Sequence, residues 1–261
     1  MFNSGNPAMN ENTFAMPYDR ADAISRPEGM TVMGTVYKTM LLLLAVVASG
    51  TFTWNMAMSS GTIPGAWTFG GMIAGLVLAL VIIFKPTTAP FLSPLYAVAQ
   101  GLFLGGVSAF YEMNFGAGQS SGGVALNGIV IQAVGLTFGV TAAMLIAYAT
   151  RIIRVTEKLR AGIIMAVGGV MLFYVVSIVL GLFGVDVPLL HSNGPLGIGI
   201  SLVIVAIAAF SLLLDFDLIE RGSAAGAPKY MEWYGAFGLM VTLIWLYLEI
   251  LRLLAKLQSR D

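Results

Sequence analysis

Seven long apolar stretches, separated by short polar ones, make up most of the chain. They lie at about residues 36–58, 66–84, 92–111, 125–149, 161–184, 196–219 and 234–256. Each has roughly the 17–25 residues that a helix needs to cross a bilayer. None alternates polar and apolar residues as a barrel strand does, so helices are the remaining way to span a membrane. The pattern predicts an all-α polytopic membrane protein with seven transmembrane helices.

The polar segments give the expected domain organisation. Residues 1–35 form a polar N-terminal tail, residues 36–256 a seven-helix transmembrane domain, and residues 257–261 a C-terminal tail. The first tail lacks an early apolar run, so it does not read as a signal peptide, and its composition is typical of a disordered cytoplasmic segment. The longest loops have about a dozen residues, too few for a separate soluble domain.

Basic residues alternate between the loops and indicate the orientation. They occur at Arg20, Arg26 and Lys38, at Lys85, at Arg151, Arg154, Lys158 and Arg160, and at Arg221 and Lys229. The three intervening loops hold no lysine or arginine. Because cytoplasmic loops carry the excess of basic residues, the N-terminus is expected in the cytoplasm.

The C-terminal end does not follow this alternation. After seven crossings it should lie outside, yet it carries Arg252, Lys256 and Arg260. We expect the seventh helix to cross fully, with a re-entrant path as the alternative, because the earlier helices usually set the orientation. The low hydrophobicity of its end predicts that the other six helices enclose it.

Composition supports a membrane location and narrows the chemistry. The chain is 58% hydrophobic and 10% charged, whereas a soluble domain is about 25% charged. Its formal net charge is zero, which gives no reason to expect a nucleic-acid partner. Without cysteine, and with His191 as its only histidine, it can form neither a disulfide nor a multi-histidine metal site. We expect no resident cofactor.

Carboxylates lie in two of the apolar stretches. Asp215 and Asp217 are near the end of the sixth, and Glu249 is well inside the seventh. A charge deep in a bilayer costs roughly 2.5–3.5 kcal/mol on insertion scales, so such residues are candidates for function. Glu249, Arg252 and Lys256 share one helix face. This face predicts a polar path; alternatively, Glu249 only pairs with Arg252 and both basic side chains extend to the membrane interface.

The two aspartates of the sixth stretch point about 200° apart on an ideal helix. Asp215 is expected to be solvated at a helix end, whereas Asp217 has Arg221 at i+4. Asp217 and Glu249 reach the same depth only if the turn between their helices lies near Trp233. Otherwise the connecting segment must fold, or the sixth helix must bend, to bring them together.

Two motifs carry a resemblance to a known family. The sequence DFDLIE at 215–220, followed by LYLEILRLL at 246–254, resembles the end of the Bax inhibitor-one family, the transmembrane Bax-inhibitor-motif proteins. On this match Asp217 takes the first acidic position and Glu249 the second. The chain looks like a bacterial member. QGLFLGG at 100–106 also resembles the third-helix motif of that family, with Gln100 where many members carry Glu.

The resemblance implies a fold and a function. Family members are similar in having two triple-helix layers around a central seventh helix, and the likeness implies a pH-sensitive calcium leak. It also implies that Asp217 and Glu249 form a dyad that shares a proton, and that Lys85 is a latch holding the first acid. Here Glu replaces the usual Asp in the seventh helix, and Lys85, a point charge, replaces the more rigid Arg.

The chemistry of such a dyad follows from electrostatics. Two neighbouring carboxylates cannot both ionise cheaply, so one pKa rises and the pair titrates as a unit. A lysine that pairs with one acid holds it ionised, so proton concentration selects between two arrangements. Calcium prefers six to eight oxygen ligands. Asp217, Glu249 and water could therefore bind it only transiently, as conduction requires.

Together with the acids inside the apolar stretches, the resemblance leads us to expect a pH-gated calcium (cation) leak channel, not an enzyme, in a bacterial-type inner membrane. The expected partners are the lipid bilayer and calcium ions. A non-conducting regulator that binds a membrane protease or another membrane protein remains an alternative, as does a proton-coupled transporter. A serine protease is poorly supported, because Ser108 and His191 lie in no activating motif. An aspartyl protease is poorly supported as well, because no Gly-rich motif precedes the second acid.

Overall fold

The computed structural model describes residues 29–116, 128–184 and 194–259. The first 28 residues of the predicted N-terminal tail, and the loop that contains His191, lie outside the described residues. Within these ranges the regular secondary structure is helical, and seven helices are long and apolar enough to cross a membrane. The predicted all-α polytopic membrane fold is confirmed.

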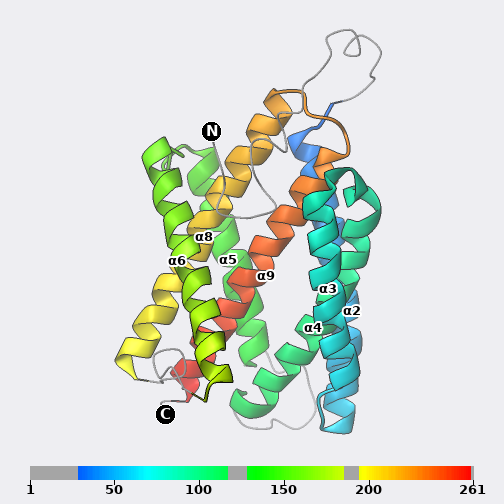
Figure 1. The fold of residues 1–261 in the computed structure, drawn as a ribbon, viewed down its shortest axis with the longest axis vertical. Coiled ribbons are helices and arrows are strands. Elements are labelled where there is room, and N and C mark those ends of the chain that lie inside the picture. Colours follow the sequence, from blue (N-terminus) through cyan, green and yellow to red (C-terminus); the bar gives the residue numbers. More distant parts are fainter. Residues whose placement is uncertain (1–28, 117–127, 185–193, 260–261) are drawn as a thin grey trace. The chain divides into compact units, whose positions relative to one another are not determined.

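The helices coincide with the predicted apolar stretches but extend beyond most of them (Figure 1). They are α2 (Val32–Ser60), α3 (Gly65–Phe84), the short 3-10 helix η2 (Pro86–Thr88), α4 (Ala89–Phe115), α5 (Ile129–Ala149), α6 (Glu157–Leu182), α8 (Pro195–Ala224) and α9 (Met231–Gln258). Hydropathy locates only the apolar part of a helix, whereas polar residues set its ends. Thr31 caps α2 and Thr156 caps α6 through their hydroxyl oxygens.

Contacts divide the chain into two units. The first comprises Met1–Phe110 and Asp215–Val241, and the second comprises Tyr111–Leu214 and Thr242–Asp261. Helices α8 and α9 therefore each contribute one part to each unit. Among the seven helices, the 18-residue apolar segment of α9 is the most buried, with 56% of its residues buried against 17% in α5 and in α6. The low exposure of α9 agrees with the prediction that the seventh helix is enclosed.

Glycines bring α2, α3 and α4 together in the first unit, where the three helices run alongside one another (Figure 1). A Cβ atom at Gly50 on α2 would lie 3.2 Å from the carbonyl oxygen of Gly101 on α4. A Cβ atom at Gly71 on α3 would lie 2.5 Å from the carbonyl oxygen of Ala99 on α4. Only residues without a side chain permit such close backbone approach.

The start of α9 completes the core of the first unit. The rings of Tyr96 on α4 and Phe237 on α9 meet edge to face, with centroids 4.9 Å apart, a favourable aromatic geometry. Met231, Tyr234 and Phe237 are almost fully buried. This part of the chain is therefore held by protein contacts rather than by lipid.

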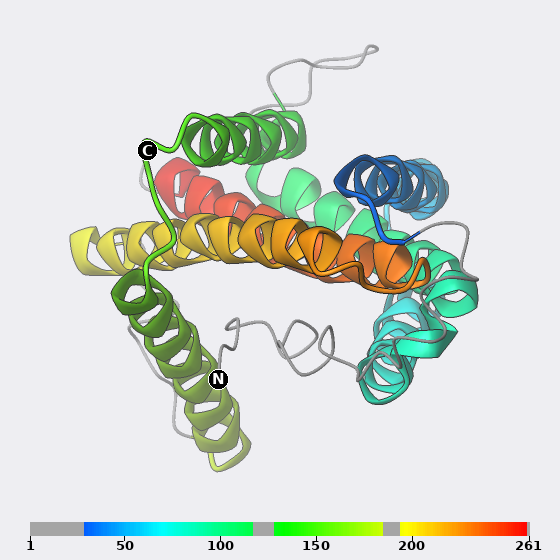
Figure 2. The ribbon, with the colours of Figure 1, turned by 90° about the horizontal axis from the view of Figure 1, so that it is seen from above.

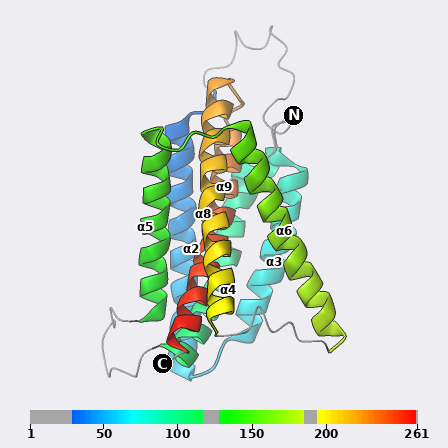
Figure 3. The same cartoon turned by 90° about the vertical axis from the view of Figure 1, so that its left-hand side faces the viewer.

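The second unit contains α5, α6, the first part of α8 and the last part of α9. Figures 2 and 3 show α5 and α6 on opposite sides of α8. Ile163 and Val167 of α6 pack with Leu214 of α8, and Trp245 of α9 joins this cluster. The cluster places the indole of α9 next to the polar site described below.

Candidate functional site

A buried carboxylate of α9 lies at the centre of the polar site in the second unit. Glu249 is 2% exposed. Its Oε1 accepts a hydrogen bond of 2.7 Å from the hydroxyl of Tyr174 on α6 and one of 3.3 Å from Trp245 Nε1. Arg252 Nη1 lies 3.1 Å from Oε1 and 3.0 Å from Oε2. The carboxylate therefore has donors from two helices and a cation one turn further along its own.

Tyr174 links the acid and the base of this site. Its hydroxyl donates to Glu249 and accepts from Arg252 Nη1, and the guanidinium carbon lies 5.3 Å from its ring centroid. The three side chains form a neutral group, because one negative and one positive charge compensate each other. Removing one partner of such a buried pair typically costs about 3–5 kcal/mol, because the other charge is left uncompensated.

Lys256 continues the polar face of α9 and is 6% exposed. Its Nζ donates to the carbonyl oxygen of Gly197 at 3.1 Å and to Ser201 Oγ at 2.9 Å, both on α8. Lys256 lies in the last turn of α9 and its partners in the first turns of α8, so the alternative in which it extends to the membrane interface stays a prediction. The pairing of Glu249 with Arg252, part of the same alternative, is confirmed.

The aspartates of α8 lie in the first unit. Asp217 Oδ2 forms a salt bridge of 3.0 Å with Arg221 Nε, as the i+4 spacing predicts. Asp215 is 1% exposed, so the expectation that it is solvated is wrong. The reason is that α8 continues to Ala224, which places Asp215 well inside the helix rather than at its end.

The two predicted dyad residues belong to different units, Asp217 to the first and Glu249 to the second. The contacts given above for each acid lie within its own unit. The turn between α8 and α9 occupies residues 225–230, and Trp233 already lies in α9. The turn position that would give both acids equal depth by helix register is therefore not met, and the dyad stays a prediction.

The other two predicted residues lie on α3 and α4. Lys85 follows the last residue of α3 and is exposed, so its role as a latch on Asp217 also stays a prediction. Gln100 on α4 lies against Gly75 of α3, where a Cβ atom would be 2.5 Å from Gln100 Nε2. The amide thus fills the space that this glycine leaves.

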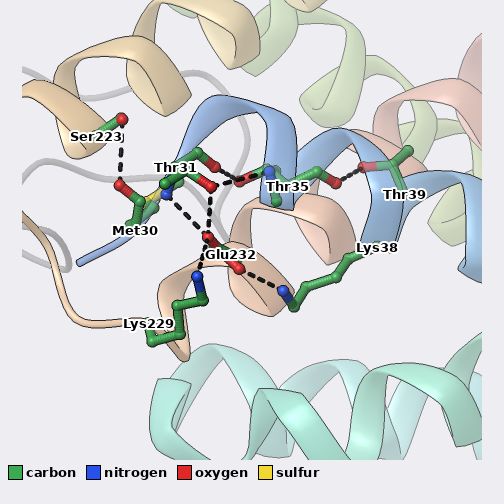
Figure 4. A network of polar contacts seen from close by, with 9 residues as sticks. Met30, Thr31, Thr35, Lys38, Thr39, Ser223, Lys229 and Glu232 are labelled. Atoms are coloured by element: carbon green, nitrogen blue, oxygen red, sulfur yellow. Dashed lines mark hydrogen bonds and ion pairs between the residues drawn. The ribbon is translucent and has the colours of Figure 1, made fainter. Parts of the chain in front are cut away.

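Sequence reasoning missed a further buried carboxylate, Glu232, in the first turn of α9 (Figure 4). It is 0% exposed. Its Oε2 forms an ion pair with Lys38, and its Oε1 lies 3.4 Å from Lys229 Nζ and accepts two hydrogen bonds from Thr31. The seventh apolar stretch begins only at residue 234, so Glu232 falls in the polar segment before it. The isolated Lys38 inside the first stretch was a signal that it needs a partner.

In the described part of the chain, seven helices long and apolar enough to cross a membrane define a polytopic α-helical membrane protein, and ionisable residues are buried among these helices. The sequence model of the Bax inhibitor 1 like family matches residues 6–259, nearly the whole chain. The chain belongs to this family, so the family indicated by the two acidic motifs is confirmed. Comparison with curated proteins and with solved structures gave no match.

Proposed function

We propose that the protein is a pH-sensitive leak for cations, calcium among them, in a bacterial-type inner membrane with its N-terminus in the cytoplasm. Membership of the Bax inhibitor 1 like family supports this proposal. The single observation that carries it is the ion-paired carboxylate of Glu249, 2% exposed inside a spanning helix. A charge in that position has a high cost in free energy, and such residues usually mark a functional site.

Proton uptake at Glu249 would act on the contacts of the site. A protonated carboxyl no longer compensates Arg252, which would remain as an unpaired buried cation. Because that state is costly, the guanidinium moves away or the helices around it rearrange. Tyr174 carries the change to α6, since its hydroxyl bonds both Glu249 and Arg252. Proton concentration thereby selects between two arrangements of the second unit.

Asp217 is the second acid of the proposal. It pairs with Arg221 in this arrangement and would share a proton with Glu249 in another, with Lys85 holding it in the ionised form. In the part of the chain that the structure describes, no group of three or more His, Cys, Asp or Glu could hold a metal ion. Calcium contact would therefore use few carboxylates together with water and would be transient.

Calcium flux into liposomes, measured under mildly acidic and mildly alkaline conditions, tests the proposal. We expect a pH-dependent flux in the unmodified protein and an altered pH dependence in Asp217→Asn and Glu249→Gln. Glu157→Gln is the matched control, because this carboxylate lies in the first turn of α6 with its side chain 63% exposed. The control should keep the original profile. An unchanged pH dependence of the calcium flux in both acid variants would contradict the proposed dyad.

A non-conducting regulator is the second candidate. Three of the buried acids have nearby basic partners, Asp217 with Arg221, Glu232 with Lys38 and Glu249 with Arg252, which suits a fixed structural role. In that case folded protein would give no calcium flux at either pH. A proton-coupled transporter would give flux only with a proton gradient or a second solute.

A further inference from the structure

The N-terminus of α2 carries half of a capping box. Thr31 is the N-cap residue, and its Oγ1 accepts a hydrogen bond of 2.9 Å from Gly34 N. In a complete box, a Glu or Gln at the third helical position accepts from the N–H of the N-cap residue. Here the third position is Gly34, which has no side chain, so its own helix cannot supply that acceptor.

Glu232 of α9 supplies the missing acceptor from 201 residues away in the sequence. Thr31 N donates to Glu232 Oε1 at 2.9 Å, and Thr31 Oγ1 donates to the same oxygen at 2.8 Å. Figure 4 shows the carboxylate of Glu232 between the start of α2 and the side chains of Lys38 and Lys229. A negative charge at this position also faces the positive end of the α2 dipole.

Gly34 and Glu232 are two halves of one arrangement. The three atoms nearest to a Cβ built at Gly34 all belong to the carboxylate of Glu232, and the contacts are so close that the carboxylate would have to move. The missing side chain at the third helical position therefore makes the room that the distant carboxylate occupies. Alanine at position 34 would displace the carboxylate without changing any charge.

The chain before α2 is tied to the same place by the backbone. Met30 N donates to the carbonyl oxygen of Ala227 at 2.7 Å, and Ser223 Oγ donates to the carbonyl oxygen of Met30 at 3.2 Å. These bonds join the segment before α2 to the end of α8 and to the turn at 225–230. The capped end of α2 and that turn thus share one set of contacts within the first unit.

We propose that Glu232 completes the cap of α2 across the chain and acts as a clasp, so that the first turn of α2 forms only while the start of α9 is docked on it. Movement of the turn at 225–230 is then transmitted to α2. The clasp does not depend on the proposed cation leak, because its contacts involve neither Asp217 nor Glu249.

Gly34→Ala is the most direct variant, because alanine raises helix propensity and leaves every charge in place. An ordinary helical position would gain stability. We expect instead that the amide of Thr31 exchanges its hydrogen about tenfold faster or more, as loss of a charged hydrogen bond requires. Gly70→Ala on α3 is the matched control, because a Cβ at Gly70 meets nothing within 4 Å; it should leave exchange at Thr31 unchanged.

A distance measurement separates the cap from the clasp. The chain has no cysteine, so Met33→Cys and Ala225→Cys at exposed positions give one pair of spin labels. We expect one narrow distance distribution, which broadens in both Glu232→Gln and Gly34→Ala.

The double variant Gly34→Glu with Glu232→Ala moves the acceptor into α2 itself. It should restore slow exchange at Thr31 but keep the broad distance distribution. The clasp is overturned if Gly34→Ala keeps the original exchange and distance, or if the double variant keeps the narrow distribution. Should Glu232→Gln fail to fold, Gly34→Ala still decides, since it preserves the charges.

Discussion

At the scale of single residues, the partners of a buried charge decide what it can do. The spacing of Glu249 and Arg252 predicted their pairing, because residues three apart share a helix face. Tyr174 could not be predicted as the third member, since it belongs to another helix and sequence periodicity does not say which helices meet. For the same reason the sequence did not reveal the contact of Glu232 with Thr31.

Arg252 and Lys256 lie about one turn apart and should respond to replacement by methionine with stability losses of different size. Arg252→Met leaves the carboxylate of Glu249 buried without its cation, which should cost about 3–5 kcal/mol of unfolding free energy. Lys256→Met removes an ammonium that is bound by neutral oxygens, so no charge is left uncompensated and we expect a smaller loss, about 1–3 kcal/mol for oxygens left unpaired.

Unfolding in mixed micelles measures both changes. The loss in Arg252→Met should be largest under alkaline conditions and shrink under acidic ones, because Glu249 can then take up a proton and become neutral. Equal losses of stability in the two variants would contradict this description of the polar face.

At the scale of helices, the sequence predicted the position of each span but not its ends. The apolar stretches mark the lipid-facing and core residues, whereas α2 begins earlier, at Val32 after the capping Thr31, and polar residues continue α8 on to Ala224. The second difference explains the misplaced environment of Asp215. Caps and polar final turns carry no hydropathy signal, so the apolar pattern alone could not locate the helix ends.

Two adjacent glycines of α3 test the close approach of α3 and α4. Gly71→Ala brings a Cβ within 2.5 Å of the Ala99 carbonyl oxygen, and the forced separation should cost about 1–3 kcal/mol. Gly70→Ala meets nothing within 4 Å and should be neutral or stabilising by up to about 1 kcal/mol. Unfolding in micelles gives both values; similar effects at the two sites would show that α4 does not constrain α3.

At the scale of the whole molecule, composition and the spacing of apolar stretches were sufficient for the fold class, because lipid imposes helices of a fixed length. The acidic motifs indicated the family that the full-length match confirms. The sequence could not tell whether Asp217 and Glu249 meet, since this depends on where the turn between α8 and α9 falls and on how the two units that share these helices are arranged.

The orientation gives a prediction at this scale. Ser59→Cys lies in the last turn of α2, next to a loop without basic residues that is expected outside, and Arg154→Cys lies in the most basic loop, expected in the cytoplasm. A membrane-impermeant thiol reagent added to intact cells should label the first and not the second. Because the chain has no cysteine of its own, the unmodified protein is the blank. Labelling of both positions from outside would reject the seven-crossing topology.

The central claim is that Glu249 takes up the proton that changes the leak. Infrared difference spectra of the protein in liposomes, recorded between alkaline and acidic conditions, test it most directly. We predict a carbonyl band of a protonated carboxyl that appears on acidification with the same midpoint as calcium flux, disappears in Glu249→Gln and persists in Glu157→Gln. A band that persists in Glu249→Gln, or no band at pH values that change the flux, would contradict the account.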